Sequence, residues 1–270
     1  MKLSVVILHT NKPQDATQCL RSLQTVRLPA ETEIFCINNG GHNANDRVDS
    51  AAAEGLPVAF MELPRDGYVF GNNQGYKASK GEYVATVNAD ITMHEDTMEK
   101  LLDYMERHPD TGIAAPRLIY PDGHEQDSAR PFPKLREMAW RRLFKPHVHR
   151  ESTMDFNGEA EDVDWITGAM FLMSRKCLEA TGGHDERYFL FMSDITLCRE
   201  AWAHGMRVVQ LRDAKAIHNE SRLSKGSPLK MLKKRTGRAH ILDAAKYFLK
   251  YGWRSAPAGS PSSKKPLPKA

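Results

Sequence analysis

The sequence predicts an α/β protein with a mainly parallel central sheet flanked by helices. Short apolar runs rich in β-branched residues alternate with segments of helical spacing, as in parallel strands joined by right-handed crossover helices. Polar residues follow several of these runs, where open α/β sheets bind their ligands. The length of 270 residues and the 41% hydrophobic fraction fit a soluble globular protein with one large domain or two small ones.

The first half of the chain contains four expected strands. They cover residues 3–8, 33–37, 58–63 and 83–87, and helices are expected at 14–23, 46–54 and 69–79. The polar loops after the first, second and fourth strands should share one edge of the sheet and form a crevice large enough for a nucleotide. These loops contain Thr10 and Asn11, Asn38 and Asn39, and Asn88 and Asp90.

The loop after the fourth expected strand reads Asn88-Ala89-Asp90. Two oxygen-bearing side chains one residue apart could face a hard divalent cation and the phosphates that it carries. Asn and Asp are also common turn residues, so a turn without a ligand explains the same residues. The chain lacks the G-x-G-x-x-G fingerprint of dinucleotide sites, and residues 10–13 are not the glycine-rich phosphate loop that a nucleotidyltransferase would need.

The chain becomes less regular after a helix expected at 94–108. Pro116 lies inside a strand expected at 113–120, which favours an edge or bent strand. Residues 124–161 have poor periodicity and many prolines and charges, apart from a short helical pattern at 135–144. We interpret 124–161 as a mobile acceptor-side segment over the crevice, with a disordered insertion as the alternative.

Two residues in the later part of the chain, Asp194 and His218, carry candidate chemistry. Ser193 is suited to cap a helix at 194–202 that ends at Gly205. Asp194 in its first turn either complements the helix dipole or serves as a general base facing the crevice. His218 ends a later expected strand, as a structural residue or as a ligand.

Taken in order, these patterns resemble family 2 glycosyltransferases with the GT-A fold, and among them the bacterial rhamnosyltransferase-like branch. The resemblance covers residues 1–222 and rests on eight short motifs in the family's order. The motifs are residues 4–11, Asn38-Asn39-Gly40-Gly41, Gly67-Tyr68 with Asn73-Gln74-Gly75, Asn88-Ala89-Asp90, residues 164–169, residues 182–186, Ser193-Asp194 and His218.

The resemblance implies an inverting transfer of a sugar from a nucleotide diphosphate donor to a hydroxyl of a glycan or lipid-linked acceptor, in bacterial surface polysaccharide synthesis. The catalytic base would be Asp194, and Mn²⁺ or Mg²⁺ would be held by Asp90 and His218. The donor would contact Thr10, Asn11, Asn38, Asn39, Asn73, Asn88, Asp90 and Gly168. The acceptor would contact Asp164, Trp165 and Asp185. A Trp that begins a buried strand is alternatively a core residue.

Four positions depart from the family pattern. Asn38 stands where the family usually has a base-binding Asp, so the nucleotide preference stays open. Ser193, Thr196 and Glu200 replace the usual Glu, Asp and Arg around Asp194. These changes favour the alternative of a catalytically silent nucleotide-sugar or glycan-binding domain, whereas the retained base and metal residues favour an enzyme.

The charge of the chain is unevenly distributed. Residues 222–270 hold thirteen Lys and Arg and one acid, Asp243, whereas the preceding residues hold 25 basic and 33 acidic residues. Helical spacing of apolar residues predicts a basic amphipathic extension at 223–254, divided into two helices at Gly237, and a disordered tail at 255–270. The extension fits an anionic membrane surface, or packing on the domain or a partner subunit. Nucleic acid is not expected, because the acidic body would repel it.

Composition also predicts the compartment. The four cysteines lie among apolar neighbours, so we expect buried thiols in a reducing compartment, without disulfides or zinc. No run of about eighteen apolar residues occurs, and the N-terminal run is too short for a signal peptide. The expected location is the cytoplasm, or the inner face of the membrane if the extension binds lipid.

Overall fold

The computed structural model describes residues 1–40, 48–64, 67–135, 154–219, 235–252 and 256–263. Its strands are β1 (Leu3–His9), β2 (Thr32–Asn38), β3 (Val58–Glu62), β4 (Tyr83–Asn88), β5 (Ile91–Met93), β6 (Thr111–Ile119), β7 (Ala129–Arg130), β8 (Ala160–Asp162), β9 (Trp165–Ile166), β10 (Met170–Ser174) and β11 (Arg207–His218). Its helices are α1 (Pro13–Leu23), η1 (Ser50–Ala53), α2 (Gly67–Ala78), α3 (Thr97–Arg107), α5 (Arg175–Thr181), α6 (Ser193–Ala203), α8 (Arg235–Tyr251) and η2 (Pro261–Ser263).

The main sheet is mixed. Among the described residues it contains nine strands, in the order β3-β2-β1-β4-β10-β6-β11-β5 with β8 paired to β11, while β7 and β9 form a second small sheet. β3, β2, β1 and β4 are parallel, and β6 is parallel to β11. β10 is antiparallel to both of its neighbours, and β5 and β8 are antiparallel to β11. The expected α/β class is right, and its sheet is less parallel than the sequence suggested.

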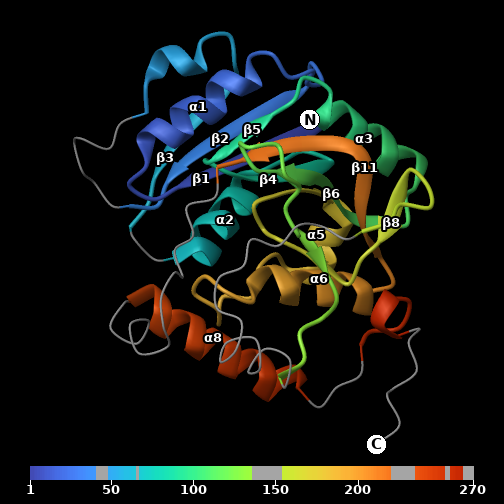
Figure 1. The fold of residues 1–270 in the computed structure, drawn as a ribbon. Coiled ribbons are helices and arrows are strands. Elements are labelled where there is room, and N and C mark those ends of the chain that lie inside the picture. Colours follow the sequence, from blue (N-terminus) through green and yellow to red (C-terminus); the bar gives the residue numbers. More distant parts are fainter. Residues whose placement is uncertain (41–47, 65–66, 136–153, 220–234, 253–255, 264–270) are drawn as a thin grey trace, which may run out of the picture.

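Helices cover both faces of the sheet (Figure 1). α1 and α3 pack on one face, and α2, α5 and α6 pack on the other. Successive residues of β1 alternate between the two cores: Val5 and Ile7 face the α1 and α3 side, and Val6 and Leu8 face the α2 and α6 side. Burial on both faces explains why residues 3–8 form an uninterrupted apolar run.

Of the two expectations for the strand that contains Pro116, an edge position is wrong, whereas an irregularity at the proline is observed. β6 lies between β10 and β11. Its ladder with β11 breaks at Pro116 and resumes with Arg117 opposite Lys215, so residues 211–214 of β11 stand opposite the proline. Pro has no N–H to donate to a ladder, and the Nε2 of Gln210 reaches the carbonyl oxygen of Pro116 at 3.3 Å. The irregularity was predicted; the interior position was not.

Several local predictions also need correction. Of the helix expected at 46–54, the described part is only the short η1. Met192, with a left-handed φ of 64°, caps α6, and Ser193 is the first helical residue. The described parts of 124–161 are partly built into sheets through β7 and β8. The helical pattern at 135–144 falls outside the described residues after Leu135.

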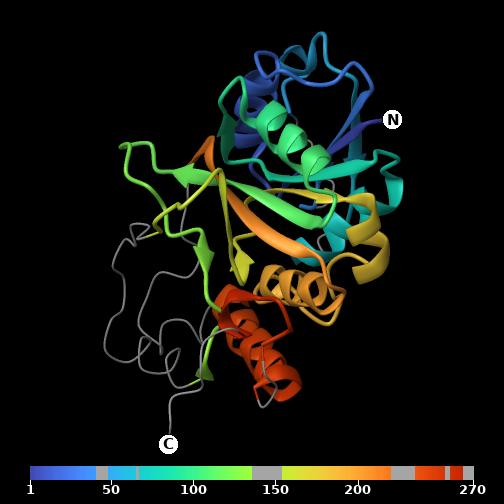
Figure 2. The same ribbon diagram turned by 90° about the vertical axis from the view of Figure 1, so that its right-hand side faces the viewer.

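The C-terminal helix packs on the domain instead of dividing at Gly237, which lies inside α8. Tyr247, Phe248 and Tyr251 of α8 are buried in the same core as α6. Two views of the molecule place α8 beside α6, on the far side of that helix from the sheet (Figures 1 and 2). The part of 223–254 before Arg235 is outside the described residues.

The disorder expected for 255–270 is wrong for residues 256–263. Ser260 is fully buried. The backbone nitrogen of Ser262 donates to Oδ1 of Asp164 at 2.8 Å, and its hydroxyl contacts Oδ2 of the same carboxylate. A buried carboxylate therefore provides acceptors for a segment whose composition alone indicated disorder.

Two broader observations complete the fold. The expectation of buried free thiols is confirmed for Cys19, Cys36, Cys177 and Cys198. Within the part of the chain that the structure describes, no helix has both the length and the apolar character needed to cross a membrane.

Candidate active site

The ends of β1 and β2 lie side by side at one edge of the sheet, with His9 paired to Asn38. Asn38 and Asn39 are buried. The Nδ2 of Asn38 donates to Oε2 of Glu62 at 2.9 Å, and the Nδ2 of Asn39 donates to the carbonyl oxygen of Gly67 at 2.6 Å. Both predicted donor-binding amides thus hold the loops of this edge together, and their contact with a donor stays a prediction.

Thr10 and Asn11 are exposed where β1 ends. Asn11 has a φ of 52°, in the left-handed region that Asn tolerates better than most residues. A Cβ at Gly40 would stand 1.9 Å from the Oδ1 of Asn11. Gly40 therefore allows the loops after β1 and β2 to approach closely, as a ligand that spans both would require.

β5 and β11 bring Asp90 and His218 together. Ile91, which follows Asp90, pairs with His218 across the antiparallel β5–β11 ladder. The carbonyl oxygen of Asp90 accepts the backbone N–H of Asn219 at 2.9 Å. The Nε2 of His218 lies 3.5 Å from the Oδ1 of Asp90.

A second residue fixes the tautomer of His218. The Nε2 of Gln126 donates to the carbonyl oxygen of His218 at 3.0 Å, which orients the amide so that its Oε1 faces the Nδ1 of His218 at 2.9 Å. Nδ1 must then carry the hydrogen. In the neutral ring, Nε2 therefore presents a lone pair to Asp90.

The two facing atoms need a positive charge between them. The Oδ1 of Asp90 is buried and has no hydrogen-bond partner. A lone pair on the Nε2 of His218 facing a carboxylate oxygen is satisfied by a proton on that nitrogen or by a bound cation. A histidine whose other ring nitrogen donates to an amide or carboxylate is the usual geometry of a metal-ligating histidine, so the pair fits the expected metal site.

Asp194 lies in the first turn of α6 and is fixed by backbone amides. Its Oδ1 accepts from the N–H of Ile195 at 2.9 Å, and its Oδ2 accepts from the N–H of Gly168 at 3.2 Å. Burial raises the pKa of Asp194, and these two hydrogen bonds and the charge of Arg130 oppose that rise. A carboxylate with a raised pKa and a fixed position is suited to take a proton.

Tyr68 fixes the glycine whose backbone N–H binds Asp194. Its hydroxyl donates to the carbonyl oxygen of Gly168 at 2.6 Å, and a Cβ at Gly168 would stand 2.7 Å from that hydroxyl. Burial is the main cause that raises the pKa of Tyr68, and Tyr76, Asp194 and Asp90 add to it. Tyr68 thus helps to set the position of the N–H group that Asp194 accepts.

The backbone continues this link to the end of β4. The N–H of Asn88 donates to the carbonyl oxygen of Ala169 at 2.8 Å, and Ala169 follows the glycine that contacts Asp194. Asn88 itself is partly buried at the strand end. Asn88, two residues before Asp90, and Asp194 therefore both form hydrogen bonds with the backbone of one loop, residues 167–169.

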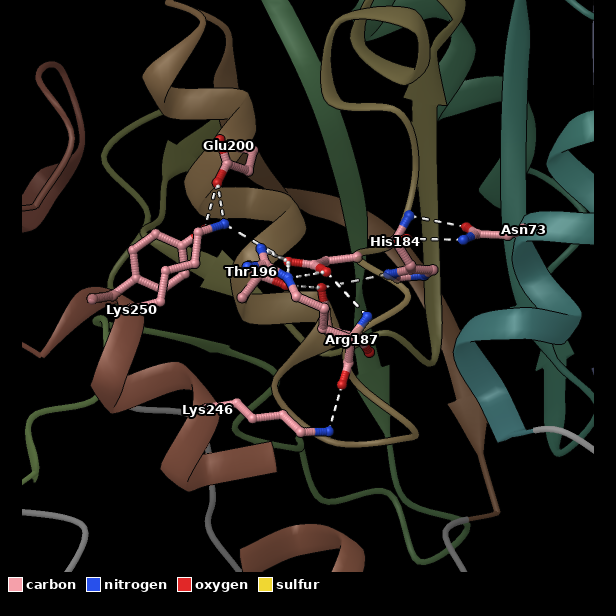
Figure 3. A network of polar contacts seen from close by, with 10 residues as sticks. Asn73, His184, Arg187, Thr196, Glu200, Lys246 and Lys250 are labelled. Atoms are coloured by element: carbon pink, nitrogen blue, oxygen red, sulfur yellow. Dashed lines mark hydrogen bonds and ion pairs between the residues drawn. The ribbon is translucent and has the colours of Figure 1, made fainter. Parts of the chain in front are cut away.

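Asn73 has a structural role that the sequence did not indicate. Its Nδ2 donates to the carbonyl oxygen of His184 at 2.8 Å and its Oδ1 accepts the N–H of His184 at 3.0 Å (Figure 3). The Nδ1 of His184 in turn lies 3.4 Å from the carbonyl oxygen of Ser193. Asn73 thus supports the start of the helix that carries Asp194, and its predicted donor contact is untested.

The predicted acceptor residues are also engaged by the protein. Both oxygens of Asp164 accept hydrogen bonds, from the N–H of Phe132 and from Ser262. Trp165 is buried in the core, and its Nε1 donates to the carbonyl oxygen of Pro131 at 2.8 Å. Asp185 forms an ion pair with Arg187. Burial raises the pKa of Asp185, but the hydrogen bonds and the charge of Arg187 outweigh this, so the pKa is lower than the usual value.

Sequence reasoning missed Tyr68, Gln126 and His184 as site residues. Tyr68 and His184 fall inside motifs that were recognised, where only the neighbouring Asn and Asp residues were given roles. Gln126 lies in an irregular segment without a motif, and only the strand pairing of its distant partner reveals it.

Comparison with known structures identifies the fold. A mannosyltransferase from Pyrobaculum calidifontis, solved with GDP-mannose and Mn²⁺, superposes with a TM-score of 0.61 at 15% identity, covering 92% of this chain and 64% of that one. The class is the GT-A glycosyltransferase fold, as the sequence predicted.

Comparison of sequences identifies the family. The model of glycosyl transferase family 2 matches residues 4–181, and the chain belongs to this family. It is 27% identical over 182 residues to N-acetylglucosaminyl-diphospho-decaprenol L-rhamnosyltransferase of Mycobacterium tuberculosis, covering 65% of this chain and 58% of the relative. It is 26% identical over 165 residues to rhamnosyltransferase WbbL of Escherichia coli, covering 56% and 61%. The chain thus spans about three fifths of each relative's length.

His184 generates a stability prediction. Burial lowers its pKa to about 4, so between pH 6.5 and 4 the unfolded chain binds a proton that the folded chain does not. Relative to His184→Asn, which keeps a donor near Nδ1, the wild type should lose about 3 kcal/mol of unfolding free energy as the pH falls through this window. Urea unfolding at pH 7 and pH 4.5 measures the difference; parallel pH profiles for the two proteins would contradict the buried neutral histidine.

Proposed function

We propose that this chain is an inverting glycosyltransferase. It moves a sugar from a nucleotide diphosphate donor to a hydroxyl of a glycan or lipid-linked acceptor, in bacterial surface polysaccharide synthesis. The observation that carries the proposal is the arrangement around residues 167–169, whose backbone forms hydrogen bonds with Asp194 and with Asn88, two residues before the Asp90 that faces His218. The relatives' names, a rhamnosyltransferase and one that acts on a diphospho-decaprenol, support a deoxyhexose donor and a lipid-linked acceptor.

The donor side needs a positive charge near its diphosphate. Asp90 and His218 would hold Mn²⁺ or Mg²⁺, with phosphate oxygens and water completing the coordination. No group of three or more metal-ligating side chains occurs in the described ranges, as expected if the donor supplies most of the ligands. A divalent cation bound there would act as a Lewis acid and stabilise the charge on the leaving diphosphate. The Mn²⁺ in the Pyrobaculum structure supports this choice of metal.

Asp194 is suited to act on the acceptor. It would take the proton of the acceptor hydroxyl while that oxygen forms a bond to the anomeric carbon and the bond to the diphosphate breaks. One displacement from the opposite face inverts the anomeric configuration. No protein acid is required, because the diphosphate leaves as an anion, unlike the leaving group in glycoside hydrolysis.

A catalytically silent binding domain is the alternative class. The replaced residues favour it, but in the structure they have partners that keep the site ordered. The hydroxyl of Thr196 donates to the carbonyl oxygen of Ser193 at 2.9 Å, and Glu200 accepts from Lys250 at 3.2 Å and pairs with Tyr251 (Figure 3). These contacts support an active enzyme in which Lys250 and Tyr251 of α8 bind Glu200, one of the residues that departs from the family pattern near Asp194.

The proposed location is the cytoplasm, with α8 in contact with an anionic membrane. Ile241, Leu242 and Leu249 are 43%, 59% and 82% exposed, and exposed apolar residues that gather on one helix can mark a membrane or partner contact. Arg238 and Lys246 are exposed on the same helix. An apolar strip flanked by cations fits the headgroup region, and such adsorption would bring the site close to a lipid-linked acceptor.

The first test concerns the base. Asp194→Asn should lower kcat by at least about 10²-fold, the usual minimum for a general base, while donor binding persists. In the wild type, kcat should fall on the acid side at a pH above the ordinary value of 3.8 for an Asp, because the raised pKa means that the base is protonated earlier. Asp103→Asn, at an exposed carboxylate on α3, is the matched control. Near-normal turnover in Asp194→Asn would remove this residue from the role.

The second test concerns the metal. Asp90→Ala and His218→Ala should each reduce transfer, and Gln126→Leu should weaken the apparent Mn²⁺ affinity about 10–100-fold, because it removes the acceptor that orients His218. Titration of Mn²⁺ into the chelator-treated enzyme measures this. Full activity in excess chelator would show that Asp90 contacts only the donor.

The third test concerns the membrane. Leu242→Ser/Leu249→Ser should lower partitioning onto vesicles of phosphatidylcholine and phosphatidylglycerol by about tenfold or more, because two exposed leucines no longer insert. The wild-type binding should weaken as salt rises. Phe60→Ser, at a 48% exposed residue on β3, is the matched control. Absence of wild-type co-sedimentation at low salt would leave α8 with a packing role alone.

A further inference from the structure

The segment just before the base is held by a carboxylate of α8. Asp243, the single acid among residues 222–270, is 1% exposed. Its two oxygens accept the three consecutive backbone N–H groups of residues 189–191, at distances of 3.0–3.3 Å. These hydrogen bonds join the C-terminal helix to the loop that leads into α6.

This arrangement is specific to a carboxylate. A buried charge is costly unless hydrogen bonds and opposite charge compensate it, and a helix that only packed on the domain would place an apolar residue there. Lys246 lies 3.6 Å from the Oδ1 of Asp243 and also donates to the carbonyl oxygen of Arg187 at 2.5 Å (Figure 3). We call Asp243 and Lys246 the α8 clamp; together they bind residues 187–191 at four backbone positions.

The clamped loop is also confined from the other side. A Cβ at Gly67 would stand 2.6 Å from the carbonyl oxygen of Phe189, so the start of α2 approaches this loop closely. Phe191 packs on His240 of α8, with ring centroids 4.3 Å apart. The loop therefore lies between α2 and α8.

A strained residue connects the loop to the base. Met192, directly after the clamped amides, has a left-handed φ of 64° and caps α6. Such a conformation is unfavourable for a non-glycine residue and persists only where the surroundings impose it. Two residues later, Asp194 points at the N–H of Gly168. The clamp thus acts on the backbone that sets the direction of the base.

We propose that Asp243 is a positioning residue for the transfer reaction: through residues 189–191 and Met192 it fixes Asp194 against Gly168. The inference rests on the proposed function of Asp194. It gives the basic extension a role inside the catalytic domain that its cationic composition did not suggest.

Kinetics of Asp243→Asn test the proposal. The amide keeps one acceptor but loses the charge and the second oxygen. We expect kcat to fall about 10–100-fold, as for a displacement of about 1 Å in a reacting group, while the donor KM stays within twofold because the donor edge is built from β1, β2 and β4. The acid limb of the kcat–pH profile should also move, since the amide contacts of Asp194 change. Unchanged kcat and an unmoved acid limb would overturn the proposal.

Glu33→Gln is the matched control. Its Oε1 accepts from the hydroxyl of Ser4 and the backbone N–H of Lys80, both at 2.6 Å, so it is another carboxylate that fixes a loop, but one without a link to Asp194. The control should lower thermal stability without changing kcat. An equal loss of kcat in both variants would mean that Asp243 affects stability alone.

Hydrogen–deuterium exchange separates this inference from the proposed function, because it requires no substrate. In Asp243→Asn, exchange should accelerate at residues 189–191 and also at Gly168 and the first turn of α6. Acceleration confined to 189–191 would overturn the positioning role even if the wild type is active. If the wild type transfers no sugar, acceleration at Gly168 would still support the mechanical link.

Lys246→Met provides the test if Asp243→Asn fails to fold. Lys246 is 48% exposed, so its replacement leaves the core intact. It removes the hydrogen bond to the carbonyl oxygen of Arg187 and should lower kcat severalfold at unchanged donor KM. Wild-type kcat together with wild-type exchange at Gly168 would overturn the proposal.

Discussion

The structure depends on a pair of atoms that cannot face each other without a positive charge between them. The Oδ1 of Asp90 is buried without a partner, and the Nε2 of His218 faces it at 3.5 Å. Gln126 accepts the hydrogen of the other ring nitrogen, which leaves a lone pair toward Asp90 in the neutral ring. The turn after β4, the short β5 and the return of β11 together place these two atoms at the edge where α/β sheets bind phosphates, and either a proton on Nε2 or a bound cation supplies the charge between them.

Asp194, the proposed base, is held by backbone amides instead of side chains. Asp194 accepts from the N–H groups of Gly168 and Ile195, and its helix begins at a strained residue. Its support comes from far away in the sequence: Asn73 and His184 on one side, and α8 on the other. Burial that raises the pKa of this carboxyl is useful only if the direction of the group is fixed, so the supporting contacts and the chemistry depend on each other.

Much of the fold could be predicted because it is recorded in local patterns. The alternating apolar runs identified the strands, and the polar residues after β1, β2 and β4 lie at one edge of the sheet, as the sequence predicted. The order of short motifs selected Asp90 and His218, which the structure brings together. The helix that starts with Ser193 stops just before Gly205, which has a left-handed φ of 72° as expected for a C-terminal glycine.

The rest could not be predicted because it arises from contacts between distant segments. Pro116 is tolerated inside the sheet only because β11 bulges opposite it, and no local pattern encodes that. Asn73 looks like a ligand-binding residue by composition, but its partner is the backbone of residue 184. Residues 256–263 have a composition typical of disorder, yet Asp164 provides the acceptors that order them. The roles of Gln126 and Asp243 likewise follow only from the partners that tertiary structure brings to them.

Thermal unfolding with a panel of nucleotide diphosphate sugars, each with and without Mn²⁺, tests the central claim most directly. A ligand bound only by the folded state raises the unfolding temperature by mass action. The account predicts that at least one nucleotide sugar stabilises the wild type, that Mn²⁺ increases this stabilisation, and that the increase disappears in Asp90→Asn. Stabilisation by the sugar nucleotide that is identical with and without Mn²⁺, in both proteins, would contradict a cation between Asp90 and His218.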